Sequence, residues 1–230
     1  MKKKYFKIFK KLKNNMFLFC SAGIMLLTTG CSFAGVTYQN YVQAVLDCSY
    51  HQNYQAYCDM TDHTISEAEA LFLNEKISLS TRIRHYYGIK SDFISEEMIQ
   101  QYDDFAGEIL KQTKYTIREV NRTGDVYQVT LILSPVDFWE RTAPEIENYY
   151  ENDFTPKYSR AKTQQKADML EEVYARQVLR ILEQSLKELD YLVPVQYDFT
   201  IGTGENSVQG TTWQEIDSIL LGYAETASES

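Results

Sequence analysis

A basic segment followed by a short apolar segment, at the start of the chain, limits where the folded part can lie. Residues 1–15 carry seven lysines and no acid, residues 16–27 are largely apolar, and the small residues Thr29 and Gly30 follow. This order is typical of a secretory signal peptide that a peptidase removes. The sequence therefore predicts a cleaved leader over residues 1–30, so the fold has to be built from the rest of the 230 residues.

The cysteine at the predicted cleavage site indicates how the protein is held. The hexapeptide LLTTGC at residues 26–31 resembles the lipobox of bacterial lipoproteins, although Thr28 stands where that family usually has leucine. The resemblance implies that the Cys31 thiol carries a diacylglyceryl group, whose two acyl chains give stable membrane anchoring. We therefore expect a lipoprotein at the extracytoplasmic face of the cell membrane, with residues 31–37 as the lipidated cysteine and a short tether.

The charge of the remaining chain excludes one class of partner. The precursor has 23 basic and 32 acidic residues, and removing the seven lysines of the leader leaves 16 basic residues, a net charge of −16. A chain this acidic repels nucleic acid and favours basic partners. It is also repelled by anionic lipid, so the acyl chains and not the surface charge must hold it at the membrane.

The first half of the remaining chain has the pattern of helices followed by a hairpin. Apolar residues recurring every three or four positions predict helices over residues 38–49, 54–60, 64–88 and 95–110. Thr64 and Glu67 have the spacing of a capping box, and Ser95 is a second N-cap. From Lys114 the apolar period changes to two, which predicts an antiparallel hairpin that turns at Gly124 and ends at Pro135.

The second half has a similar pattern. Helices are predicted over residues 139–150 and 162–189, with a break at Thr155-Pro156, and residues 195–201 and 208–211 are predicted to form a second hairpin. Thr212 and Glu215 have the spacing of another capping box that opens a last helix. Residues 38–226 are thus expected to form one α+β domain, with helices packed on antiparallel hairpins, before a disordered tail at residues 227–230. The halves 38–135 and 136–226 are either a weak helix–hairpin repeat or two stretches that share a plan without duplication.

Three segments add a family resemblance. Together with the lipobox, YVQAVLD at residues 41–47, KYTI at 114–117 and SPVDF at 134–138 are similar to a group of uncharacterised lipoproteins from Gram-positive bacteria. The resemblance implies an extracytoplasmic α+β domain, with a cystatin-like or nuclear-transport-factor-like shape as one form it can take. It implies no catalytic or binding residue. Those folds contain both enzymes and binding modules, so the shape alone does not determine function.

One cluster of side chains has the chemistry of zinc ligands. It lies within 17 positions and comprises His51, Cys58, Asp59, Asp62, His63 and Glu67. Imidazole, thiolate and carboxylate groups bind zinc, but the close pairing of ligands that marks such sites is absent. We therefore predict a solvated loop between helices, with no metal and no cofactor.

Cys48 and Cys58 are the thiols that remain once the leader is removed and Cys31 is lipidated. On one unbroken helix they would lie too far apart for a disulfide, so a bridge requires the chain to turn back near Gln52-Asn53. Two interpretations stay open: a Cys48–Cys58 disulfide formed outside the cytoplasm, or two buried free thiols.

No motif for nucleophilic or metal catalysis is present: the chain has no Gly-x-Ser-x-Gly and no His-Glu-x-x-His. The sequence therefore favours a non-catalytic, surface-anchored module that binds a protein, a peptide or a small ligand. A small hydrolase acting on wall or extracellular polymers is the alternative, and it would need two carboxylates facing each other. The solute-binding component of an importer is a third hypothesis.

Overall fold

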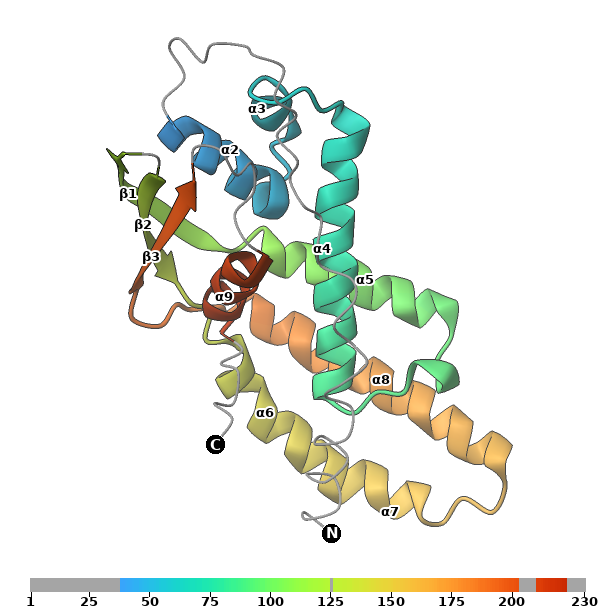
Figure 1. Cartoon of the computed structure of the whole chain (residues 1–230). Coiled ribbons are helices and arrows are strands. Elements are labelled where there is room, and N and C mark those ends of the chain that lie inside the picture. The colour runs from blue at the N-terminus through green and yellow to red at the C-terminus, as the bar shows by residue number, and fades with distance from the viewer. Residues whose placement is uncertain (1–37, 125, 203–209, 223–230) are drawn as a thin grey trace.

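The computed structural model describes residues 38–124, 126–202 and 210–222, which form the predicted α+β fold (Figure 1). The predicted leader, Cys31 and the tail at residues 227–230 lie outside the described residues. The strands are β1 (Lys114–Thr123), β2 (Val126–Ser134) and β3 (Val195–Gly202). The helices are α2 (Tyr38–His51), α3 (Tyr54–Cys58), α4 (Ile65–Tyr86), α5 (Glu96–Leu110), α6 (Phe138–Tyr149), α7 (Thr155–Tyr158), α8 (Gln164–Leu186) and α9 (Gly210–Leu220), with a 3-10 turn η1 (Ser91–Phe93) and a π-helical turn η2 (Tyr150–Phe154).

The strands form one antiparallel sheet in the order β1-β2-β3. The predicted hairpin of β1 and β2 is confirmed, with a shift of register between Ile117 and Glu119. A shift of this kind marks a bulge, which bends the strand and increases its twist. Helices α2 and α9 contact the sheet, and the remaining helices extend away from it (Figure 1).

The predicted second hairpin is wrong. Residues 195–201 do form a strand, but this strand pairs along β2 instead of with residues 208–211. Gly210 already belongs to α9, and Val208 lies outside the described residues. The physical reason is that β2 has a free row of backbone N–H and C=O groups on the edge that faces away from β1. A long strand paired along this edge satisfies more backbone groups than a short, separate hairpin would.

Two predicted helix boundaries also differ from the structure. Because α9 begins at Gly210, Thr212 lies inside the helix and is not its N-cap; its side chain is hydrogen-bonded to Tyr197 instead. The break predicted at Thr155-Pro156 is wrong as well, since the chain continues from α6 through η2 into α7. Pro156 falls in the first turn of α7, directly after η2, a position that proline favours because its fixed φ suits a helix.

The helix starts of the first half are confirmed. Thr64 accepts a hydrogen bond from the backbone N–H of Glu67, and the Glu67 carboxylate accepts one from the N–H of Thr64, which completes the capping box. Ser95 caps α5 by accepting from the Met98 N–H. Helix α2 ends at His51 because Gln52 has a φ of 61°, a conformation that does not continue a right-handed helix.

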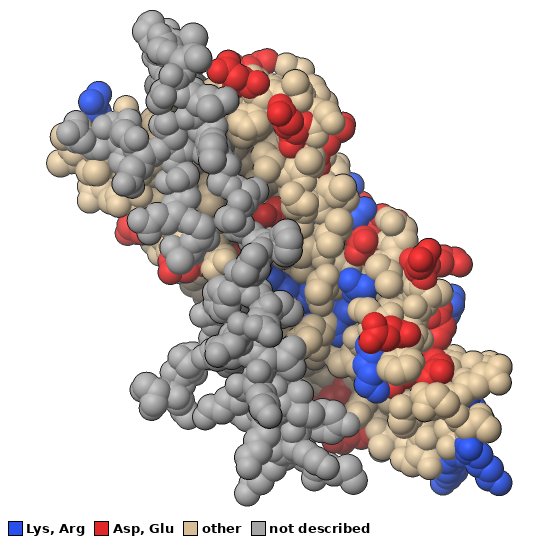
Figure 2. Space-filling view, turned by 45° about the vertical axis from the view of Figure 1, so that its right-hand side comes forward, with Lys and Arg blue, Asp and Glu red and all other residues tan. Residues whose placement is uncertain are grey.

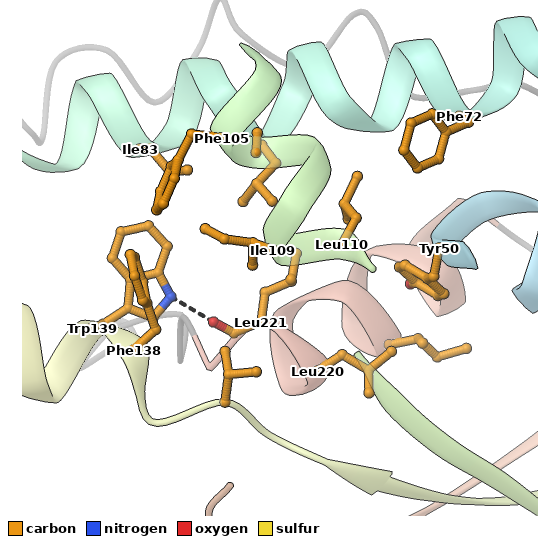
Figure 3. Close-up of a cluster of buried hydrophobic side chains, with 14 of the residues drawn as sticks. Tyr50, Phe72, Ile83, Phe105, Ile109, Leu110, Phe138, Trp139, Leu220 and Leu221 are labelled. Carbon is orange, nitrogen blue, oxygen red and sulfur yellow. Dashed lines mark hydrogen bonds between the residues drawn. The ribbon is translucent and has the colours of Figure 1, made fainter. Parts of the chain in front are cut away.

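The core lies where the sheet meets the inner faces of the helices (Figure 3). Leu131 and Leu133 of β2 are fully buried in it. Trp139 of α6 donates a hydrogen bond from its indole N–H to the Leu221 carbonyl, which ties the residues after α9 to α6. The halves 38–135 and 136–226 thus contribute to one core and one sheet, the first with two strands and the second with one; whether they are a repeat stays a prediction. No described helix is long and apolar enough to cross a membrane.

Candidate functional site

Polar side chains from four elements meet beside the core, where the end of α2 approaches α4, β1 and α9. Tyr50 of α2 is the anchor of this junction: its ring lies beside Phe72, Leu110 and Leu220 (Figure 3), and only 1% of the residue is exposed. Its hydroxyl donates a hydrogen bond to Asp217 of α9. A buried tyrosine usually places its hydroxyl on a polar partner, so the junction brings the acidic group of α9 against α2.

The second partner of Asp217 is another acid. Glu75 of α4 and Asp217 are hydrogen-bonded to each other through their side chains. The pKa of Glu75 is raised to about 8, chiefly by burial and then by the nearby charge of Asp217, against the opposing charge of Arg82. Burial also raises the pKa of Asp217, against the opposing effects of the Tyr50 hydrogen bond and the Arg82 charge. At neutral pH Glu75 therefore keeps its proton and donates it to the Asp217 carboxylate.

This shared proton defines what the pair can do chemically. A carboxyl group with a pKa near neutrality can exchange a proton at physiological pH, as general acids and bases do. Glycoside hydrolysis, however, requires two carboxyl groups about 5 Å or more apart on opposite sides of the substrate. Glu75 and Asp217 are in direct hydrogen-bond contact, so their geometry is that of a joint between α4 and α9.

A second polar cluster adjoins the first through the rings of Tyr50 and Tyr115, whose centroids are 5.8 Å apart. The Tyr115 hydroxyl donates to Asp47 Oδ1 at 2.6 Å and lies 3.2 Å from His51 Nδ1. His51 Nε2 lies 2.9 Å from the carbonyl oxygen of Thr113, which can only accept, so this nitrogen carries a proton. Burial, and then the hydrogen bond to Asp47, raise the pKa of Tyr115. Tyr115 therefore keeps its proton, and its hydrogen bond to Asp47 tethers β1 to α2.

Side chains of the candidate zinc-ligand cluster make other contacts in the structure. His51 is held by Tyr115 and Thr113, His63 lies 3.4 Å from the Tyr57 hydroxyl, and Glu67 belongs to the capping box. Within residues 38–124, 126–202 and 210–222, no group of three or more histidines, cysteines and acids is placed to hold a metal ion.

Cys48 and Cys58 are both free thiols in the structure, Cys48 fully buried and Cys58 partly. Burial raises the pKa of Cys48 to about 12. The turn at Gln52-Asn53, on which a bridge would depend, is present between α2 and α3. The oxidation state outside the cytoplasm stays a prediction.

Glu75 and Asp217 belong to no motif that the sequence pattern indicated. A signal for both exists: each acid lies within the buried face of its helix. Glu75 falls between Phe72 and Leu79 at helical spacing, and Asp217 falls beside Ile216 and before Leu220. An ionisable residue inside an apolar stripe costs free energy unless it has a partner, so it indicates a buried polar contact. The identity of that partner is not contained in either helix.

Comparisons with known proteins give information on the fold of the chain and none on its activity. The described residues define an α+β domain with a three-stranded antiparallel sheet. No family model matches the chain, and no curated protein matches it. Among solved structures, it is similar to a protein of Bacillus subtilis described as a candidate lipoprotein, ycdA, with a TM-score of 0.50 and 14% sequence identity. The match covers 80% of this chain and 56% of the other, so this chain spans little more than half of that neighbour's length.

Proposed function

We propose that the protein is an extracytoplasmic lipoprotein held at the cell membrane by a diacylglyceryl group on Cys31. The observation that carries this proposal is the order of basic segment, apolar segment, small residues and cysteine at residues 1–31. One further observation supports it: the structural neighbour is itself described as a candidate lipoprotein.

The folded part is proposed to bind a partner, and not to catalyse a reaction. In support, the two polar clusters of the junction direct their groups at each other: Asp217 is bonded to Tyr50 and Glu75, and Asp47 to Tyr115. Groups used in this way hold elements together and leave no nucleophile activated by a neighbouring base. The importer hypothesis is not carried forward, because such receptors generally have two lobes of parallel strands and the described sheet is antiparallel.

A small hydrolase is the second candidate, and one observation favours it. Glu75 has a pKa of about 8, which suits a general acid at neutral pH. If this candidate is correct, purified protein hydrolyses an ester, glycoside or peptide substrate, and Glu75→Gln abolishes the reaction while leaving the fold intact. Glu69→Gln, at an exposed position of the same helix, is the matched control. We expect no turnover on such a panel.

The anchor is tested by metabolic labelling of the full chain with radioactive palmitate in a bacterium that makes lipoproteins. Cys31→Ala is expected to abolish incorporation and to leave an uncleaved precursor. Cys20→Ala is the matched control, since Cys20 lies in the predicted leader, and this variant should be labelled and processed normally. Lipid incorporation into the Cys31→Ala variant would contradict the proposal. Capture of partners by the lipidated protein from native membranes then tests the binding role.

A further inference from the structure

The turn between α7 and α8 differs in charge from the rest of this acidic chain. Residues 154–167 contain four basic residues and no acid, although the whole chain has 32 acids to 23 bases. Figure 2 shows blue side chains gathered at the end of the molecule where α7 and α8 meet. The four residues, Lys157, Arg160, Lys162 and Lys166, are all exposed; they are named the basic turn below.

Most of the charge in the basic turn is not neutralised by an ion pair. Elsewhere, Lys76 lies 2.7 Å from Asp104, and Lys90 lies 2.6 Å from Glu171. In the basic turn Lys157 lies 3.5 Å from Asp153, a pair of exposed residues that contributes little. The other three side chains have no ion-pair partner in the part of the chain that the structure describes. The segment between Asp153 and Asp168 therefore carries four cations and no acid of its own.

The basic turn is held on a firm support. It joins α7 to α8 at the end of an arm in which α6, η2 and α7 pack against α8 (Figure 1). The ring of Tyr174 in α8 stacks on Tyr149 with centroids 6.1 Å apart, and lies 4.6 Å from Phe154. Thr163 caps α8 at the turn itself. A cationic surface held in one conformation binds a charged ligand at a lower entropic cost than a mobile one does.

We propose that the basic turn, a local cationic patch on a chain whose net acidic charge repels polyanions over the rest of its surface, binds an anionic polymer with a phosphodiester backbone outside the cell. Four cations spread along one turn match a ligand whose charges repeat along a chain, because a single small anion reaches only some of them. Binding of this kind releases counterions and weakens as salt rises. The proposal rests on the extracytoplasmic location proposed above, since only there does the turn meet surface polymers.

An anionic membrane is the other ligand with phosphate chemistry, and the position of the anchor argues against it. The seven residues from Cys31 to the start of α2 span at most about 25 Å when extended. Helix α8 alone is about 34 Å long, and the basic turn lies at the opposite end of the molecule from the start of α2 (Figure 1). An anchor beside α2 therefore directs the basic turn away from the bilayer.

The test uses the full lipidated chain in phosphatidylcholine nanodiscs and lipid-free poly(glycerol phosphate) as the probe. The variant Arg160→Gln/Lys162→Gln/Lys166→Gln is expected to bind the probe at least tenfold more weakly at low salt. The matched control, Lys111→Gln/Arg180→Gln/Lys187→Gln, removes the same charge from exposed positions elsewhere and should bind as the unchanged protein does. Circular dichroism melting of both variants checks that the fold is kept, which the exposure of all six positions favours.

Four results would overturn the proposal. The first is no binding of the probe by the unchanged protein, and the second is an equal loss in both variants. The third is binding to phosphatidylglycerol nanodiscs that depends on the basic turn when binding to the polymer does not, which would assign the turn to the membrane. Poly-glutamate should bind at least tenfold more weakly than the phosphodiester; equal binding contradicts the phosphate assignment. None of these results changes the labelling of Cys31, so failure of this inference is separable from failure of the anchor.

Discussion

Glu75 in α4 and Asp217 in α9 share a proton, and this hydrogen bond joins the last described helix to the middle of the longest helix of the first half. Tyr50 completes the joint from α2. Two acids in contact are stable only while one of them stays protonated, since the charged pair would repel in a partly buried setting. The attachment of α9 is therefore linked to pH.

We expect the free energy of unfolding to fall as the pH rises from about 4.5 to about 8. The reason is that burial raises the pKa of Glu75 from 4.5 to about 8, so across this window the folded chain binds more protons than the unfolded chain does. Glu75→Gln should reduce this fall by about 2 kcal/mol, because one pKa unit corresponds to 1.4 kcal/mol and only part of the shift is realised. Urea unfolding at several pH values measures it. In Glu69→Gln the free energy of unfolding should depend on pH as it does in the unchanged protein. An unaltered pH dependence in Glu75→Gln would contradict the shared proton.

Gly222, the second residue after α9, should tolerate no side chain. Gly222 has a φ of 67°, and a Cβ built on it would lie 2.4 Å from the Val136 carbonyl oxygen. Gly222→Ala is expected to destabilise the fold by about 3 kcal/mol, from backbone strain and the clash together. Gly124→Ala separates the two effects, because Gly124 has a φ of 61° with nothing within 4 Å of the added Cβ, and should cost about 1 kcal/mol. Equal losses of thermal stability in Gly222→Ala and Gly124→Ala would show that the backbone around Gly222 shifts and removes the clash.

The capping box of α4 should contribute measurably to stability. Thr64→Ala removes the acceptor for the Glu67 N–H and is expected to lower the free energy of unfolding by about 1 kcal/mol in urea. Ser66→Ala, at an exposed position in the first turn of the same helix, leaves the cap intact and should be neutral. A loss as large in Ser66→Ala would contradict the assignment to the cap, because alanine has a higher helix propensity than serine and Ser66 does not cap the helix.

The two thiols should differ in reactivity. Cys48 is fully buried with its Sγ 3.7 Å from the Ala68 carbonyl oxygen, and burial raises its pKa to about 12, whereas Cys58 is only partly buried. Iodoacetamide at pH 8 is expected to modify Cys58 first in a folded chain of residues 32–230, and to add two labels after denaturation without reductant. Intact mass spectrometry counts the labels. Cys58→Ser should leave the native protein almost unlabelled, and a denatured, unchanged chain without labels would establish a disulfide.

The helices and hairpin of the first half could be predicted because their signals are local. Thr64 and Glu67 lie three residues apart, and Gly124 sits between two alternating strands, so each signal acts within a few residues of its cause. The partner of residues 195–201 could not be predicted in this way, since β2 lies far away in sequence and any extended segment of suitable length competes for it. The same holds for Tyr191, whose hydroxyl donates to the Gln112 carbonyl.

From the sequence alone came the prediction of a leader, the cysteine expected to carry lipid, the acidic character of the chain and its α+β class. These properties depend on composition, on local order and on periodicity, which the chain carries whatever its tertiary arrangement. Only the tertiary structure decided that β3 joins the first hairpin, that Glu75 meets Asp217, and that the basic turn stands at the end of an arm. Each of these depends on burial and on contacts between distant segments, and one side chain cannot specify its partner until the core has brought the two together.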